Sequence, residues 1–136
     1  MRVIVLSGAY NSGKTTVLKR LTATLLGMGG RMIAKVVHGH DERCAILFKR
    51  KTVGVCSGGD DANTVRDNFA FFAVNKCDVG ISACRSVAGC GSVNAVKSCA
   101  YRLNKQLPYY VGKMRESRSR MAAVDIQAVN QIAAMI

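Results

Sequence analysis

One stretch decides the fold of this chain: Gly8-Ala9-Tyr10-Asn11-Ser12-Gly13-Lys14-Thr15. A short apolar run, residues 2–7, precedes it, and apolar residues recur at helical spacing from Thr15 to Leu26. These flanks predict a buried strand, then a glycine-rich loop, then a helix. The backbone amides of such a loop point inward at the helix N-terminus, where they can cradle phosphate oxygens. The stretch therefore predicts an α/β fold built around a phosphate-binding loop.

The residue types within the stretch suit nucleotide phosphates. Gly8 lets the chain leave the strand in a conformation that a side chain would block, and Gly13 allows close backbone approach. The order of residues fits G-x-x-x-x-G-K-[ST], in which the lysine reaches the β- and γ-phosphates and the hydroxyl binds Mg²⁺. On these residues the chain resembles the P-loop NTPase superfamily in its Walker A form. The resemblance implies ATP and Mg²⁺ as cofactors, with the nucleotide held by Gly8, Ala9, Tyr10, Asn11, Ser12, Gly13, Lys14, Thr15 and Thr16.

Length and composition favour a single domain, residues 1–136. Hydrophobic residues make up 49% of the chain and charged residues 21%, as is usual for globular domains. The apolar runs are too short to span a membrane, and the apolar start belongs to the first strand rather than to a secretory signal. We therefore expect a cytoplasmic protein with no membrane partner, whose six cysteines are reduced thiols.

The chain is strongly basic, with a net charge of +12 from 20 Lys and Arg against 8 Asp and Glu. Such a charge attracts polyanions, which include nucleotides, nucleic acids and acidic partners. The densest basic segment, Lys113 to Arg120, could reach the nucleotide, bind nucleic acid or remain a solvated loop. Nucleic-acid binding therefore stays open on charge, although no nucleic-acid-binding motif appears.

A second strand is expected from Arg31 to Val37, parallel to the first and joined to it by a right-handed crossover. The segment after it, His38 to Cys44, would leave the sheet at the carboxyl edge, where ligands bind in parallel sheets. Asp41 or Glu42 could there contact an acceptor hydroxyl or act as a base. A metal site at His38, His40 and Cys44, or a plain polar surface loop, are the alternatives.

Two short strands, residues 45–48 and 53–56, are expected to form a hairpin with a basic tip. The second runs into Ser57-Gly58-Gly59-Asp60-Asp61, and an apolar strand ending in an acid is the loose Walker B pattern for holding Mg²⁺. Asp60 is the first choice for that acid and Asp61 the second. One of the two could instead cap the helix expected from Asp61 to Val74, since Asp is favoured at that position.

Asn75-Lys76-Cys77-Asp78 matches N-K-x-D, the guanine-reading motif of GTPases. That family also carries a D-x-x-G element, which does not occur at a suitable place here, and a strand is expected immediately after, from Asp78 to Cys84. A GTPase using Asn75 to Asp78 is therefore kept only as an alternative.

The pieces Gly59-Asp60, Cys77-Asp78 and Ala83-Cys84-Arg85 are similar to those of small kinase-like P-loop proteins. That resemblance covers about the first two-thirds of the chain and is specific only at the phosphate loop. It implies that Arg85 stabilises charge on a transferred phosphoryl group, although a solvated loop arginine is an equal alternative.

The remaining chain predicts a helix from Ser92 to about Arg102, a strand opened by Pro108, and a final helix from about Met121. The core residues expected on the last helix are Ile126, Val129, Ile132 or Ala133, and Ile136. Together these elements predict a three-layer P-loop NTPase fold, with a mostly parallel sheet and helices on both faces.

The leading functional expectation is Mg²⁺-dependent ATP binding, by a small kinase-like phosphotransferase or an NTPase. In that interpretation Lys14 and Arg85 stabilise phosphate charge, Thr15 and Asp60 bind Mg²⁺, and Asp41 is a candidate base for a small-molecule or nucleotide phosphoryl acceptor. The competing class is a nucleotide-gated module that binds nucleic acid or protein with little turnover.

Overall fold

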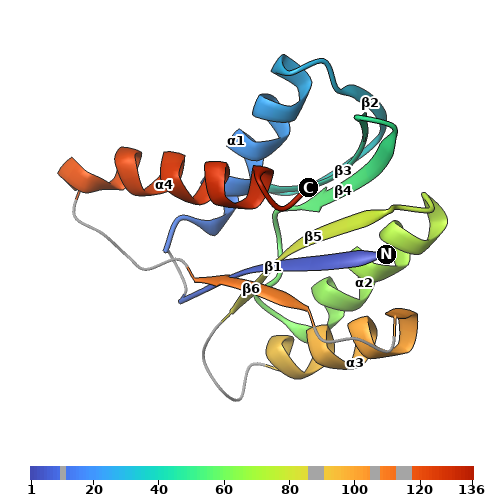
Figure 1. Ribbon diagram of the computed structural model, residues 1–136. Helices are drawn as coiled ribbons and strands as arrows, with labels where there is room; N and C mark the ends of the chain where they lie inside the picture. The colour runs from blue at the N-terminus through green and yellow to red at the C-terminus, as the bar shows by residue number, and fades with distance from the viewer. Residues whose placement is uncertain (10–11, 86–90, 105–107, 113–117) are drawn as a thin grey trace.

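The computed structural model describes residues 1–9, 12–85, 91–104, 108–112 and 118–136; in residues 104, 118 and 119 it describes the backbone only. Six strands and four helices make up this part of the chain (Figure 1). The strands are β1 (Arg2–Gly8), β2 (Arg31–His38), β3 (Asp41–Phe48), β4 (Lys51–Cys56), β5 (Val79–Arg85) and β6 (Tyr109–Gly112). The helices are α1 (Lys14–Gly27), α2 (Ala62–Val74), α3 (Ser92–Asn104) and α4 (Arg118–Ala133).

The strands form one sheet in the order β2-β3-β4-β5-β1-β6. Pairing is parallel from β4 through β5 and β1 to β6, and antiparallel where β3 joins β2 and β4. The sheet is therefore mixed, and its parallel part agrees with the sequence-based expectation. β2 does run in the direction of β1, but β3, β4 and β5 lie between them.

The segment that the sequence suggested was a loop, His38 to Cys44, is mostly strand. β2 and β3 form a tight hairpin in which His38 pairs with Asp41, so only Gly39 and His40 make the turn. Gly39 has φ 60°, a left-handed conformation that glycine adopts without steric cost. Because the antiparallel partner follows two residues later, β2 pairs locally and occupies the sheet edge instead of lying beside β1.

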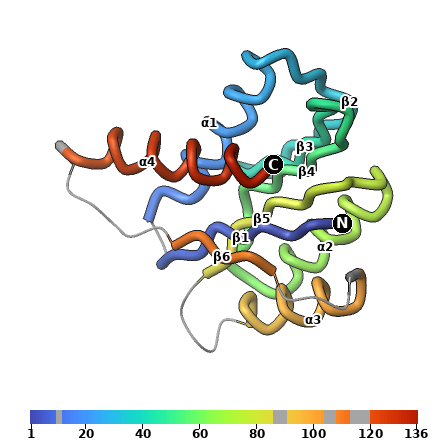
Figure 2. Tube along the Cα trace, viewed as in Figure 1, coloured from blue at the N-terminus to red at the C-terminus, as the bar shows by residue number. Residues whose placement is uncertain are grey.

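Helices cover both faces of the sheet. The trace in Figure 2 shows α1 and α4 on one side and α2 and α3 on the other. One buried apolar cluster joins α1 and α4 to the sheet, and it includes Leu18, Leu21 and Ile132. A second cluster joins α2 and α3 to the opposite face, and it includes Phe72 and Val96. The layering follows from the apolar stripe of each helix, which must be buried against the sheet.

The register of α4 differs from the sequence-based expectation. The helix begins at Arg118 rather than near Met121. Ile126, expected in the core, is 53% exposed, whereas Asp125 is buried together with Ala128, Val129 and Ile132. The buried positions are spaced as one helical stripe, and Ile126 lies beside that stripe. Val129 and Ile132 are in the core as expected.

Two strand glycines make room for one aromatic ring. A Cβ on Gly54 would lie 2.5 Å from the Phe72 ring, and a Cβ on Gly80 would lie 2.7 Å from it. These positions are neighbours on β4 and β5. Phe72 is fully buried, so α2 packs close to the sheet through this ring.

Within the described ranges, no helix has the length and apolar character needed to cross a membrane.

Candidate functional site

The glycine-rich loop that the sequence predicts to bind phosphate connects the carboxyl end of β1 to the first residue of α1, as expected. Gly13 has φ 92°, so the glycine is required by the backbone at the helix start. The Ser12 hydroxyl is fully buried and has no hydrogen-bond partner among the described residues. A buried donor without an acceptor fits an anion that the loop would enclose. Ala9 and Thr16 are exposed beside it, while Tyr10 and Asn11 lie outside the described residues.

Lys14 is folded back onto its own loop. Its ammonium group donates to the carbonyl oxygens of Gly8 at 2.9 Å and Ala9 at 2.8 Å. The side chain is only 7% exposed, and Asp60 Oδ1 lies 3.7 Å from Lys14 Nζ. Burial lowers the pKa of Lys14 below its ordinary value of 10.5, and the nearby Asp60 carboxylate opposes that shift. The lysine is therefore held against its own loop by two carbonyl oxygens, close to the Asp60 carboxylate.

Asp41 lies against the hydroxyl of Thr15. Thr15 Oγ1 donates to Asp41 Oδ1 at 3.3 Å, and Ser57 Oγ donates to the same oxygen at 3.1 Å. Asp41 is the first residue of β3, and Ser57 follows β4 directly. The β2–β3 turn therefore brings a carboxylate to the first turn of α1, at the edge where the parallel strands end.

Asp60, the first choice for the Mg²⁺-binding acid, lies beside Lys14 and Arg85. Its Oδ1 lies 3.7 Å from Lys14 Nζ and 3.9 Å from Arg85 Nε. Among the described side chains, it makes no hydrogen bond to Thr15. Asp61 caps α2, since its carboxylate accepts from the Thr64 amide at 2.7 Å. The two acids thus have separate roles, one at the lysine and one at the helix cap.

Arg85 lies at the phosphate loop. It is the last residue of β5 and pairs in register with Gly8, the last residue of β1. Its backbone amide donates to Ser92 Oγ at 3.0 Å, at the start of α3. The structure therefore brings Lys14, Asp60 and Arg85 together, with Thr15 and Asp41 forming a second pair nearby.

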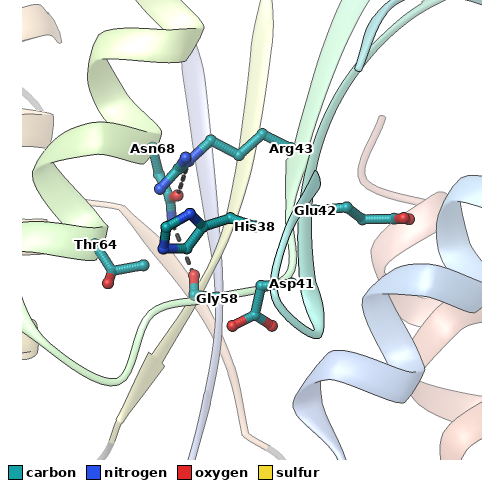
Figure 3. Close-up of a pocket in the computed structure, with 7 residues that line it drawn as sticks. All are labelled: His38, Asp41, Glu42, Arg43, Gly58, Thr64 and Asn68. Atoms are coloured by element: carbon teal, nitrogen blue, oxygen red, sulfur yellow. Dashed lines mark hydrogen bonds between the residues drawn. The ribbon is translucent and has the colours of Figure 1, made fainter. Parts of the chain in front are cut away.

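A hollow lined by side chains of mostly polar residues opens beside Asp41, between the β2–β3 hairpin and α2 (Figure 3). Its volume is about 280 Å³ with the solvent at its mouth included. The side chains that line it include His38, Asp41, Arg43, Thr64 and Asn68. Sequence reasoning missed Arg43 and Asn68. Asn68 gave a signal, because it falls on the inward stripe of α2 with Val65, Phe69 and Phe72.

The geometry bears on two of the sequence-based alternatives, and a third falls outside the described residues. Asn75 to Asp78 lies between α2 and the start of β5, about 20 Å along the strands from the phosphate loop. Asp78 there accepts a hydrogen bond from the Thr52 amide at 2.8 Å. No group of His, Cys, Asp and Glu able to hold a metal ion by itself occurs in the described ranges, so the His38, His40 and Cys44 site is not formed. The segment 113–117 lies outside the described residues.

The described cysteines are free thiols, as expected. Burial raises the pKa of Cys44 and of Cys77 to about 11, and raises that of Cys56 further. These thiols therefore stay protonated, and they contribute packing rather than reactivity.

The oxygen donors present fit Mg²⁺ when a nucleotide accompanies it. Mg²⁺ commonly takes one or two protein oxygens and completes its shell with phosphates and water. Thr15 Oγ1 and Asp41 Oδ1, 3.3 Å apart, are such a pair. Lys14 and Arg85 supply positive charge at the same loop, with Asp60 Oδ1 within 4 Å of both. The arrangement can bind a polyphosphate and neutralise charge on it.

Comparison with known proteins adds no relative: no family model matches the chain, and no curated protein or solved structure resembles it significantly.

Proposed function

We propose that this protein is a P-loop NTPase-fold enzyme that binds ATP with Mg²⁺ and transfers the γ-phosphoryl group to an acceptor. The observation that carries the proposal is the loop itself. Gly13 takes the left-handed conformation, Lys14 is stored against the loop carbonyls, and the buried Ser12 hydroxyl has no acceptor among the described residues.

The contacts of each residue indicate its role in the proposed reaction. Lys14 would exchange its carbonyl partners for the β- and γ-phosphate oxygens, where charge-assisted hydrogen bonds are stronger. Thr15 and Asp41 would hold Mg²⁺, which supplies charge neutralisation between the phosphates. Arg85 lies beside Gly8, where it can stabilise charge that develops on the transferred group. When Lys14 turns to the phosphates, Asp60 would lose its ion pair with Lys14 and keep its ion pair with Arg85.

The test is calorimetric titration of the full chain with ATP and with GTP, each with Mg²⁺. Lys14→Ala should abolish measurable binding and turnover. The matched control is Lys19→Ala, which removes the same charge from an exposed position on the same helix. Unchanged ATP binding in Lys14→Ala would overturn the proposal, and a strong preference for GTP would reassign the nucleotide.

The net charge of +12 favours a second candidate, a nucleotide-gated module that binds nucleic acid with little turnover. Titrating a DNA duplex at several salt concentrations separates the two. Neutralised phosphates release counterions, so a true nucleic-acid surface loses affinity steeply with salt.

A further inference from the structure

The hollow beside Asp41 touches the nucleotide site without being part of it. Asp41 belongs to both, because its Oδ1 contacts Thr15 and the residue also lines the hollow (Figure 3). The hollow lies at the carboxyl edge of the parallel strands, where ligands of α/β sheets bind. A molecule placed there would sit next to phosphates held by the loop.

We propose that this hollow is the phosphoryl-acceptor subsite and that it takes a small hydroxylated anion, whose charged group is held by Arg43. The inference rests on the proposed phosphotransfer function.

Arg43 is held in place by a buried hydrogen-bond network. Its Nε donates to Asn68 Oδ1 at 2.9 Å, and the Arg43 side chain is 16% exposed. Asn68 is 1% exposed and donates to the Gly58 carbonyl at 2.8 Å and to Ser82 Oγ at 3.0 Å. The network fixes the guanidinium plane before any ligand arrives. A preset fork of donors suits a carboxylate or a phosphate.

Among the described residues, Arg43 has only a long, solvent-exposed ion pair, which an anion in the hollow could replace. The nearest acid on α2, Asp67, is 71% exposed and lies 3.9 Å from Arg43 Nη2, beyond hydrogen-bond length. Glu42 points away from the other labelled side chains in Figure 3 and pairs with Lys35 at 3.6 Å. Asp41 already accepts from Thr15 and Ser57. His38 adds a further donor or acceptor on the hollow's wall.

Gly58 leaves room for the Asp41 carboxylate at the wall of the hollow. A Cβ at this position would lie 2.9 Å from Asp41 Oδ2 and 3.2 Å from Thr64 Cγ2. Any side chain here would therefore displace Asp41 or fill the space beside it. The Gly58 carbonyl also accepts the hydrogen bond from Asn68, the residue that holds Arg43 in place.

Size and lining limit the acceptor to a small molecule. The volume of about 280 Å³ includes open solvent, so the enclosed part of the hollow is smaller than an ordinary ligand pocket of about 300–1,000 Å³. Its described lining residues include no Phe, Tyr or Trp on which a nucleobase could stack. An acceptor of a few carbons with one anionic group and a hydroxyl matches these properties better than a nucleoside does.

The reaction balances without a further reactant. The acceptor hydroxyl oxygen forms a bond to the γ-phosphorus of ATP. The bond from that phosphorus to the β,γ-bridging oxygen breaks, and its electron pair leaves with ADP. The hydroxyl proton passes to solvent at the open mouth. Arg43 takes no part in bond making; it is a positioning residue that fixes the acceptor's distance from the phosphate.

The experiment uses three-carbon probes that differ only in their anionic group. Glycerate carries a carboxylate, glycerol 3-phosphate carries a phosphate, and glycerol is the neutral control. Each is titrated by NMR into the full chain, alone and with saturating ADP and Mg²⁺, so that ADP fills the phosphate loop. ADP binding is measured first, and separately. The variants are Arg43→Gln and Arg66→Gln, the latter removing an exposed arginine on α2 outside the hollow.

We expect at least one anionic probe to bind in the presence of ADP, and glycerol to bind at least tenfold more weakly. Arg43→Gln should weaken that probe by about 10- to 100-fold, the range for a lost charged hydrogen bond, whereas Arg66→Gln leaves it unchanged. Arg43→Lys, which keeps the charge but loses the fork, should weaken it severalfold and serves if Arg43→Gln does not fold. The difference between glycerate and glycerol 3-phosphate identifies the anion.

Three results would overturn the inference: no anionic probe binds while ADP does, the probes compete with ADP, or Arg43→Gln and Arg66→Gln behave alike. If ADP fails to bind and the anions still bind through Arg43, the hollow stands as an anion site and the proposed phosphotransfer function fails instead.

Discussion

Exchanging the carboxylate of Asp41 for an amide tests which acid serves Mg²⁺. Asp41→Asn keeps the shape of the side chain and removes its charge. Asp60→Asn is the matched control, because it makes the same change at the acid that sequence spacing favours. The structure places Asp41, and not Asp60, in hydrogen-bond contact with Thr15. We therefore expect only Asp41→Asn to remove the benefit that Mg²⁺ gives to nucleotide binding.

The size of the effect follows from the geometry. Thr15 Oγ1 and Asp41 Oδ1 are 3.3 Å apart. An ion bound to Thr15 at the usual distance of about 2.1 Å would lie no more than about 5.4 Å from Asp41. At that distance the attraction between a divalent cation and one carboxylate is about 1.5 kcal/mol in water and about 6 kcal/mol at an effective dielectric constant of about 20. The lower figure alone corresponds to a loss of about tenfold.

The assay is calorimetric titration with ADP, in Mg²⁺ and in EDTA. Wild type and Asp60→Asn should bind ADP more tightly in Mg²⁺, whereas Asp41→Asn should bind at least about tenfold more weakly than wild type in Mg²⁺ and equally in EDTA. Urea unfolding of each variant checks that the fold is kept. If Asp60→Asn loses the Mg²⁺ benefit and Asp41→Asn keeps it, the contact with Thr15 has been misread and Asp60 is the metal-binding acid.

Two further predictions concern the fold around the site. Asp61→Ala should lower the free energy of unfolding by about 1 kcal/mol through loss of the α2 cap, and Asp61→Asn much less. Because the hydrogen bond from the Thr64 amide lowers the pKa of Asp61 below 3.8, the part of this stabilisation that depends on the carboxylate charge should be full above pH 3.8 and lost as pH falls through the folded-state pKa, measured by urea unfolding of wild type and Asp61→Asn. Gly80→Ala should destabilise by about 1–3 kcal/mol because its methyl group meets the Phe72 ring, and Phe72→Leu in the same chain should recover part of that loss; strictly additive effects would contradict the contact.

The features that the sequence predicts correctly are those fixed by neighbouring residues. Gly13 fixes the conformation of the loop at the helix start, and α1 buries Val17, Leu18, Leu21 and Leu25, apolar residues at the helical spacing that the sequence showed between Thr15 and Leu26. Asp61 caps the helix that follows it. In each case the partners are a few residues apart, so residue type and spacing are sufficient.

The contact between Thr15 and Asp41 could not be predicted in that way. The two residues are 26 positions apart, and their meeting depends on the place of β3 in the sheet. Sequence spacing favoured Asp60 because it follows an apolar strand. That rule is correct about the edge at which Asp60 lies, but it does not say which side chain at that edge faces Thr15.

Asn68 is an intermediate case. It shares the inward stripe of α2 with three apolar residues, so its burial follows from helical periodicity. A buried amide needs hydrogen-bond partners, and this one finds them in Gly58, Ser82 and Arg43. The sequence therefore predicts that Asn68 is buried and needs hydrogen-bond partners, but only the folded structure shows which residues those partners are.

Asp41 and Asp60 lie at the same edge of the sheet, and their contacts suit them to different states of the site. Lys14 is 7% exposed, and its charge is costly to bury without an anion nearby. Asp60 lies 3.7 Å from it and opposes the lowering of its pKa by burial. Phosphates entering the loop would supply that negative charge themselves, and Asp60 would then face Arg85 alone. Asp41, with Thr15 already in contact, becomes useful only when a cation accompanies the phosphates. We infer that Asp60 stabilises the site without nucleotide, and that Asp41 stabilises the site with nucleotide and Mg²⁺ bound. Removing the Asp60 carboxylate should therefore lower the free energy of unfolding measured without nucleotide, with little effect on nucleotide affinity. Removing the Asp41 carboxylate should do the reverse.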